Sequence, residues 1–383
     1  MSQFESPTPP RPPIGSVIPP LILGTATFNH QYVEDPSRMP YVQVVAQALE
    51  RGVRAFDTSP YYGPSEILLG DALGRLSDPP PRESYFLVTK AGRIASSEFD
   101  YSPQWIRYSV HRSLERLKTP YLDLVYTHDV EFVSPAEVVT AVKELRKLRD
   151  EGLIRYVGIS GYPVHLLCDL AKLVLEETGA PLDAVLSYGH FSIQNGTLGH
   201  EDVLSAFKSS GVGVVLNASM LGMGLLTTRG ADRGPMASWH PAPHELQVAC
   251  RSLSDLATGA GQTLEKIAIR WALLNWARVG AVVGSQGTPR ATLPRVGVSV
   301  MGVCSPAELE ETCEVWESVL DELEGRSSSD EINNLVESRM WPSLGSWHDF
   351  SWPSPPPGFK NERTSADQVP EDDISRKYKL VKD

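Results

Sequence analysis

Four polar residues of different chemistry stand at or just after the ends of three successive apolar runs of the chain. Asp57, Lys90 and His128 close these runs, and Tyr62 follows Asp57 by five residues. The pKa of a free phenol, about 10, is too high for proton transfer near neutral pH, but a neighbouring ammonium favours the phenolate and lowers that pKa. A carboxylate can orient such an ammonium, and a neutral imidazole can polarise a carbonyl oxygen. Together these residue types suit proton transfer at a carbonyl or an alcohol.

Each of the four residues taken alone also has an ordinary structural explanation. Asp57 can cap a loop, and Tyr62 can be a packing residue with an exposed hydroxyl. Lys90 can be a solvated strand end and His128 a hydrogen-bonded core histidine. Their joint spacing decides between the two explanations, because the carboxyl ends of neighbouring parallel strands meet at one mouth of a barrel. The sequence therefore predicts that the four side chains share a site.

The elements that must position these residues follow from hydrophobic patterning. From Leu21 onward, short apolar or β-branched runs alternate with segments of helical spacing. The runs predict strands over residues 21–24, 53–58, 85–90, 122–128, 156–160, 183–188 and 213–217. The other segments predict helices over residues 42–51, 65–76, 103–117, 135–151, 164–177, 201–209, 263–275 and 306–324. Nearly all-apolar strands separated by helices indicate a parallel sheet covered on its faces.

This alternation predicts an α/β fold, a (β/α)8 TIM barrel with a parallel eight-stranded sheet. The alternative is a doubly wound nucleotide-binding sheet, which would carry a glycine-rich turn directly after its first strand. Residues 24–27 are Gly-Thr-Ala-Thr, and no G-x-G-x-x-G motif follows them. The barrel is therefore favoured. Two similar apolar runs, at residues 281–284 and 298–302, could each supply the eighth strand.

Composition at the two ends of the chain predicts segments outside the barrel. The first twenty residues hold seven prolines, so residues 1–19 are expected to be an extended, mobile arm. Residues 20–325 are expected to form the barrel. Residues 326–383 combine tryptophan, proline clusters and a charged end, which predicts an irregular, partly disordered extension. It could either lie over the barrel through its tryptophans or be disordered.

Charge and cysteine usage exclude several classes of function. The 383 residues carry a formal net charge of −12, which argues against nucleic acid or an anionic membrane as a partner. The four cysteines form no CxxC pair and no zinc-like cluster with histidine, so no metal is expected. Neither a secretory signal nor an apolar run of about 18 residues is present. These features predict a cytoplasmic protein acting on a small molecule; its oligomeric state is left open.

The motifs around the four residues resemble those of the aldo-keto reductases. The resemblance rests on GVRAFDTSPYYGPSE (52–66), FLVTK (86–90), DLVYTH (123–128) and GIS (158–160). It implies a barrel that binds a nicotinamide dinucleotide without a Rossmann fold and moves hydride between this cofactor and a carbonyl or alcohol. It also implies roles for the four residues: Tyr62 as proton shuttle, Lys90 as the cation that tunes it, Asp57 as anchor and His128 as the residue that orients the substrate oxygen.

The same resemblance implies where the cofactor lies. Ser160 would face the nicotinamide amide, although Gly161 stands where relatives usually have Asn. The segment 299–312 would hold the adenosine end; it contains no Lys or Arg, and Glu308 stands about where relatives that use NADP place an Arg. A carboxylate repels a 2′-phosphate, so NAD is expected over NADP. The other expected cofactor contacts are Gly24, Thr25, Ser187, Tyr188, Ser219, Leu221, Gly302, Glu311 and Thr312.

Within the family, residues 186–191 and 221–227 resemble the branch that contains the L-galactose and NAD-dependent D-arabinose dehydrogenases. This resemblance implies oxidation of the anomeric hydroxyl of an aldose to the aldonolactone. His30 and Trp105 are candidate substrate contacts together with His128. Two alternatives remain at this point. One is an NADPH-dependent reductase of small or aromatic aldehydes, and the other is a non-catalytic, cofactor-binding regulatory subunit that binds its partner through the C-terminal extension.

Overall fold

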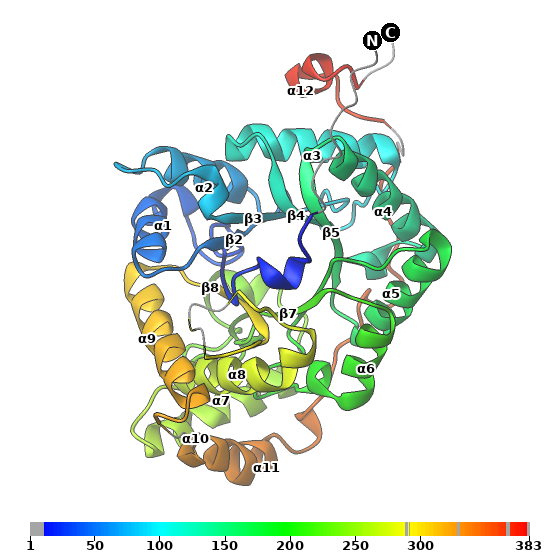
Figure 1. Cartoon of the computed structure of the whole chain (residues 1–383). Helices are drawn as coiled ribbons and strands as arrows, with labels where there is room; N and C mark the ends of the chain where they lie inside the picture. Colours follow the sequence, from blue (N-terminus) through cyan, green and yellow to red (C-terminus); the bar gives the residue numbers. More distant parts are fainter. Residues whose placement is uncertain (1–10, 288–289, 291, 328–329, 365–367, 381–383) are drawn as a thin grey trace.

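The computed structural model describes residues 11–287, 290, 292–327, 330–364 and 368–380. Eight parallel strands form a closed barrel in which each strand pairs with its neighbours in sequence and β8 pairs with β1 (Figure 1). The strands are β1 Leu21–Gly24, β2 Ala55–Asp57, β3 Phe86–Ala91, β4 Leu122–His128, β5 Ile154–Gly161, β6 Ala184–Tyr188, β7 Val214–Ala218 and β8 Val298–Gly302. The predicted (β/α)8 barrel is therefore confirmed.

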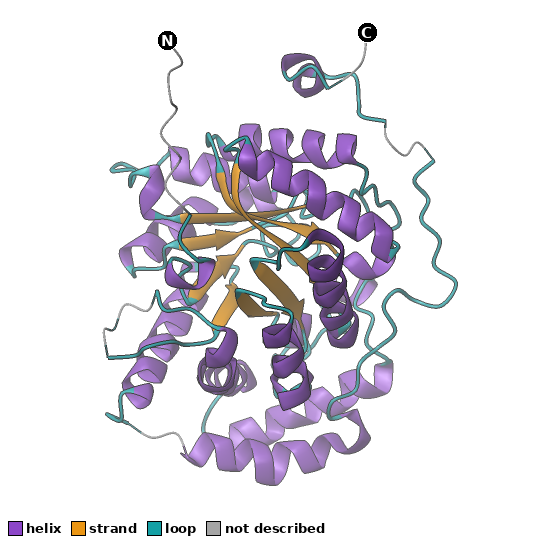
Figure 2. Ribbon diagram, turned by 45° about the vertical axis from the view of Figure 1, so that its right-hand side comes forward, coloured by secondary structure: helices purple, strands orange, loops and turns teal. Residues whose placement is uncertain are grey.

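A ring of helices surrounds the strands, as Figure 2 shows. These helices are α1 Tyr41–Glu50, α2 Ser65–Gly74, α3 Pro103–Leu117, α4 Pro135–Asp150, α5 Val164–Thr178, α6 Glu201–Ser209, α7 His244–Gly259, α8 Leu264–Val279 and α9 Pro306–Leu323. Local sequence explains their starts, because hydroxyl side chains at Ser102, Ser134, Thr263 and Ser305 accept hydrogen bonds from first-turn N–H groups.

The structure differs from the sequence analysis at one helix and settles the position of one strand. Helix α7 is missing from the predicted elements, although Leu246, Cys250, Leu253 and Ala257 are buried at helical spacing. The ambiguity over the eighth strand is settled in favour of residues 298–302. The competing run lies in a 3-10 helix, Gly280–Val283, because it continues directly from the end of α8.

Strand alternation fills the barrel with side chains. One set of alternate residues, which includes Ile22, Ala55, Val88 and Leu124, packs in a single cluster inside the barrel. The other set faces outward and packs against the helices in the larger core. The set of alternate residues that faces inward on each strand determines which polar side chains reach the barrel mouth.

The N-terminal segment is not the extended arm that its prolines predict. Ile14 and Ile18 are buried among the inward-facing residues of the barrel. The hydroxyl of Tyr156 donates a hydrogen bond to the carbonyl of Pro12, and the Arg11 guanidinium pairs with Asp183. Figure 1 shows this dark-blue segment across the amino-terminal end of the strands. Burial of the two isoleucines holds it there; the part before Arg11 lies outside the described residues.

The C-terminal extension is more regular than its composition predicts. It contains short helices, α10 Asp330–Leu335, α11 Trp341–Leu344 and α12 Asp373–Lys377. The first two, with the π-helical turn Val336–Met340 between them, pack on α7 and α8, and Val336, Met340 and Leu344 are buried. The following segment, residues 349–363, runs past the loops at the carboxyl ends of the strands before reaching α12 (Figure 2). No helix among the described residues is long and apolar enough to span a membrane.

Candidate active site

Strand parity directs the predicted residues toward one place. Ala55, Val88 and Tyr126 face the barrel interior, so the residues two positions later on the same strands also face inward. These residues are Asp57, Lys90 and His128, and each lies at or next to the carboxyl end of its strand. The sequence prediction that three strand ends share a mouth therefore agrees with the geometry.

Lys90 and Asp57 form a buried ion pair across β2 and β3. The Lys90 ammonium donates to Asp57 Oδ1 at 2.6 Å and to the carbonyl of Thr58 at 2.9 Å. Both side chains are almost inaccessible, at 2% and 6% exposure. Burial raises the pKa of Asp57 above its usual value, and Lys90 opposes this shift. The pair fixes the position of the ammonium beneath the mouth.

Tyr62 lies above this pair in the loop between β2 and α2. The centre of its ring is 4.8 Å from Lys90 Nζ and 5.7 Å from the centre of the His128 ring, to which it is perpendicular. Burial, and then the negative charge of Asp57, raise the pKa of Tyr62 well above its ordinary value. This direction is opposite to the one expected from the sequence. The physical reason is that burial disfavours the charged phenolate, and the carboxylates of Asp57 and Asp129 disfavour it further.

His128 is held as a neutral ring. Its Nδ1 is 3.0 Å from the hydroxyl of Ser59, and burial lowers the pKa of His128 to about 3. A neutral imidazole can donate one N–H to a substrate oxygen without carrying charge, as the sequence analysis expects.

We expect the buried, neutral state of His128 to be visible in the pH dependence of stability. An unfolded histidine has a pKa near 6.5, so between pH 6.5 and about 3 the unfolded chain binds the extra proton and stability falls as pH falls. His128→Gln should remove this contribution, flattening the profile by up to about 1.4 kcal/mol per pH unit. Urea unfolding at pH 7, 6, 5 and 4.5 measures it. The exposed control His165→Gln should keep the wild-type slope; equal slopes in all three proteins would contradict the assignment.

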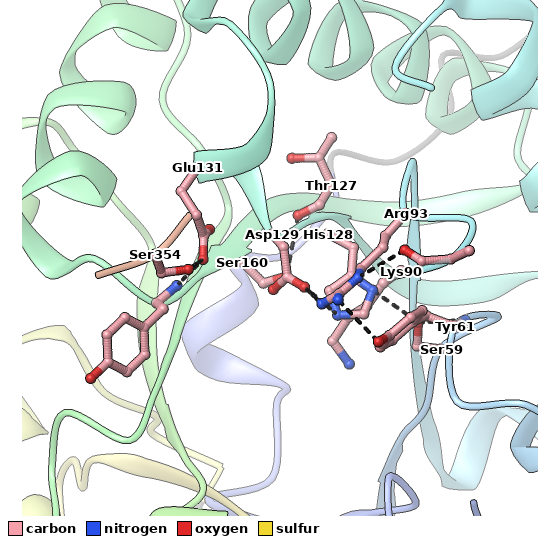
Figure 3. Close-up of polar contacts among 12 residues, drawn as sticks. Ser59, Tyr61, Lys90, Arg93, Thr127, His128, Asp129, Glu131, Ser160 and Ser354 are labelled. Atoms are coloured by element: carbon pink, nitrogen blue, oxygen red, sulfur yellow. Dashed lines mark hydrogen bonds and ion pairs between the residues drawn. The ribbon is translucent and has the colours of Figure 1, made fainter. Parts of the chain in front are cut away.

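Three residues beside His128 were missed by the sequence analysis. Asp129 forms a close ion pair with Arg93, and its Oδ2 lies 3.7 Å from His128 Nε2 (Figure 3). Arg93 also donates to the Tyr61 hydroxyl at 3.0 Å and stacks on the Tyr61 ring. Asp129 has a left-handed backbone with φ of 57°, which is uncommon for a non-glycine residue. Their positions in the sequence could have identified them as candidates, because all three residues follow the predicted strand ends.

Glu131 explains the unexpected glycine after Ser160. A side-chain carbon on Gly161 would lie 2.5 Å from Glu131 Oε2, so this carboxyl occupies the space next to Gly161. Glu131 Oε1 accepts from the N–H of Tyr162 and from the hydroxyl of Ser354 in the C-terminal extension (Figure 3). Burial, and then the charge of Asp129, raise the pKa of Glu131 to about 8.

The expected nicotinamide contacts are only partly brought together. Ser160 faces inward, two residues after the inward Gly158, and its hydroxyl donates to the Thr127 carbonyl. Tyr188 also packs against the interior cluster. Ser187 has the opposite parity, and its hydroxyl lies 3.5 Å from His190 Nδ1. Thr25 is enclosed, with its hydroxyl bonded to the Asp57 carbonyl. Ser187 and Thr25 therefore do not face the mouth, because alternation turns them toward the helices.

Glycines and a turn line the far side of the mouth. A side-chain carbon on Gly24 would approach Val300 to 2.9 Å, so this glycine allows β1 and β8 to pack closely. Gly302 is exposed at the end of β8. Ser219 has a positive φ of 56° in the turn after β7, and Leu221 is half-buried in the same turn. These positions lie at the carboxyl ends of β1, β7 and β8.

The segment expected to bind the adenosine end forms the start of α9. Glu308 accepts a hydrogen bond from the Cys304 N–H at 2.7 Å, and the Thr312 hydroxyl donates to the Glu308 carbonyl. Glu308 is therefore also a helix-capping residue. Two cations from neighbouring elements join this region: Lys266 of α8 lies 3.9 Å from Glu311, and Arg51, just after α1, lies 3.3 Å from Glu310.

The two candidate substrate contacts differ in position. His30 is exposed in the loop after β1, with Nδ1 2.9 Å from the Glu34 carbonyl. Trp105 does not reach the mouth. It lies in the first turn of α3 with 4% exposure, next to Tyr108 and under the Arg363 guanidinium. The C-terminal extension, which supplies Arg363, covers this helix start, so the structure does not bring Trp105 together with the other candidate residues.

Fold and site together define a barrel oxidoreductase that pairs a phenol with a buried Lys–Asp pair and a neutral histidine. The chain belongs to the aldo/keto reductase family, whose model matches residues 20–329. The resemblance seen in the sequence is thus confirmed. Members of this family use nicotinamide cofactors. Among the described residues, no group of three or more His, Cys, Asp or Glu side chains is arranged to hold a metal ion.

Characterised relatives act on sugars according to their names. The chain is 42% identical over 270 residues to D-arabinose 1-dehydrogenase of Saccharomyces cerevisiae, covering 70% of this chain and 78% of that protein. It is 34% identical over 316 residues to L-galactose dehydrogenase of Arabidopsis thaliana, covering 82% and 86%. A glycerol dehydrogenase structure from Gluconobacter oxydans has the same fold, with a TM-score of 0.55 at 21% identity, covering 86% of this chain and 93% of that one.

Proposed function

We propose that this protein oxidises the anomeric hydroxyl of an aldose, of the D-arabinose or L-galactose type, to the aldonolactone with NAD. Two kinds of observation support the proposal. The relatives with the identities given above are named for the oxidation of aldoses. The site presents ionic and hydroxyl groups beside His128, including Arg93 and Asp129, which suit a polyhydroxylated substrate better than an aromatic one.

The observation that carries the reaction type is the arrangement of Tyr62, Lys90, Asp57 and His128. His128, neutral through the physiological range, can donate to the reacting oxygen and fix its position. Tyr62 is the proton shuttle because its ring lies within 6 Å of both His128 and Lys90. A high pKa suits donation of a proton to an alkoxide in the reductive direction. In the oxidative direction Tyr62 must first release its own proton to solvent before it can take up the hydroxyl proton, and Lys90 is the cation beside its ring that opposes the effect of burial and favours the phenolate.

Electrons and protons balance in this scheme. The anomeric carbon loses a hydride, and its oxygen loses a proton to the Tyr62 phenolate, which has already given its own proton to solvent, so the hemiacetal becomes a lactone. Bound NAD would supply the acceptor for this hydride. Ser160 at the inner end of β5 and the turn containing Ser219 are the residues that would hold the nicotinamide end. Glu308 and Glu311, at the start of α9, would face the ribose hydroxyls and disfavour a 2′-phosphate.

A panel of free sugars with NAD tests the proposal. We expect NADH absorbance to rise with D-arabinose or L-galactose, and kcat/KM to be at least ~10-fold higher with NAD than with NADP, the scale of one unfavourable charge contact. The matched reverse assay uses NADPH with simple aldehydes. Faster turnover of aldehydes with NADPH than of any sugar with NAD would contradict the proposed function and favour an aldehyde reductase.

A further inference from the structure

Arg93 is a cation at the barrel mouth to which the reaction scheme assigns no step. It follows the end of β3 by two residues and comes three residues after Lys90, so its position differs from that of the buried ion pair. Its side chain keeps 15% of its surface exposed, whereas Lys90 keeps 2%. Burial acts to lower the pKa of Arg93, but Asp129 and Tyr61 raise it, so the guanidinium stays charged.

The guanidinium is fixed on several sides. Asp129 pairs with Nη1, the Tyr61 hydroxyl accepts from Nη2 at 3.0 Å, and the Ala95 carbonyl accepts from Nε at 3.4 Å. The Tyr61 ring lies beneath it, 3.7 Å from Cζ. Arginine has five N–H donors, and these contacts use three of them. The remaining two, one on each Nη, have no partner among the described residues.

The guanidinium and His128 have Asp129 as a common neighbour. Asp129 Oδ2 pairs with Arg93 Nη1 and also lies 3.7 Å from His128 Nε2 (Figure 3). Asp129 thus links the Arg93 guanidinium to the neighbourhood of the His128 ring. Oxygens on adjacent carbons of a sugar are also about one hydrogen-bond length apart. A donor placed next to His128 is thus placed for the oxygen next to the reacting one.

We propose that Arg93 is a specificity-determining residue that binds the hydroxyl on the carbon adjacent to the reacting carbon, while Asp129 and Tyr61 position its guanidinium. The assignment rests on the proposed function for its substrate class. Every aldose except a 2-deoxy sugar carries a hydroxyl on C2, the carbon adjacent to the reacting carbon. It goes beyond that function by naming the residue that distinguishes a 2-hydroxy substrate from an otherwise similar aldehyde.

Reduction of a matched pair of aldehydes, glyceraldehyde and propanal, tests Arg93 with saturating NADH or NADPH. Wild-type enzyme should prefer glyceraldehyde by at least ~10-fold in kcat/KM, the scale of one hydrogen bond to a charged group. In Arg93→Met this ratio should fall toward one, through a loss for glyceraldehyde beyond any change for propanal. Arg93→Lys, which keeps the charge but loses the fork, should give an intermediate ratio.

The chain offers a close control at the opposite end of the barrel. Arg82 pairs with buried Asp123 and stacks on the Tyr121 ring at 4.0 Å, with 13% of its side chain exposed. Arg82→Met should lower stability, as Arg93→Met does, but keep the wild-type ratio. A ratio that survives in Arg93→Met, including a parallel loss for both aldehydes, would overturn the assignment. Failure to oxidise any sugar would instead refute the proposed function, because the aldehyde ratio is measured independently of it.

Discussion

Tyr62→Phe should lower kcat by at least ~10²-fold, the usual scale for loss of general acid–base catalysis, while cofactor binding persists. The hydroxyl is the proposed proton carrier, and no described residue forms a hydrogen bond with it, so its removal leaves no partner unsatisfied. The free energy of unfolding should therefore change by less than about 0.5 kcal/mol. Stopped-flow turnover, cofactor titration by fluorescence and urea unfolding together measure these three quantities.

The neighbouring tyrosine supplies the matched control for this experiment. Tyr61→Phe removes a hydroxyl that accepts from Arg93 rather than one that transfers a proton. Its loss of kcat with propanal should stay below ~10-fold, because Tyr61 positions a binding residue. Near wild-type turnover in Tyr62→Phe, or equal losses in the two variants, would contradict the role of Tyr62 as proton shuttle.

Lys90→Met should produce the largest loss of stability at the site. The substitution leaves the Asp57 carboxylate unpaired at 6% exposure, and breaking a buried ion pair from one side costs about 3–5 kcal/mol. Turnover should also fall, since the cation beside the Tyr62 ring is lost. The double variant Asp57→Asn/Lys90→Met should recover most of the stability and none of the activity, because it removes the buried charge but not the need for an ammonium.

Denaturant unfolding with a double-mutant cycle measures this difference. Arg75→Met is the exposed comparison: Arg75 pairs with Asp71 at 3.2 Å, but 61% of its side chain is exposed. Its loss should change stability by less than about 1 kcal/mol. If Lys90→Met were as mild as Arg75→Met, the Lys90–Asp57 pair would not be a buried, mutually dependent unit.

The barrel and the convergence of its strand ends could be predicted because they depend on local patterns. Apolar runs such as residues 122–128 coincide with strand β4, and alternation along each strand determines which polar residues face inward. The direction of the pKa shift of Tyr62 could not be predicted. It depends on burial and on the approach of the Asp57 and Asp129 carboxylates, neither of which the order of residues reveals.

Contacts between distant segments account for most of the remaining differences. Trp105 lies at the predicted helix, but Arg363, more than 250 residues later, covers it. Ile14 resembles part of a proline-rich arm until the inside of the barrel is known. Arg93 and Asp129 carry no motif, and only their pairing across two strand ends makes them recognisable. Sequence patterns thus predict the helices and strands better than they predict the side-chain contacts between distant segments.

The path of residues 349–363 has a consequence for how the protein matures during synthesis. Asn361 bonds to the backbone of Phe99, and Ser354 bonds to Glu131 beside the end of β5. Because the ribosome releases the chain from its N-terminus, these partners emerge long before the residues that complete them. The rim of the barrel therefore gains these contacts only after translation has passed the eighth strand. Docking of residues 349–363 is thus a late event in folding, after the barrel strands have been synthesised.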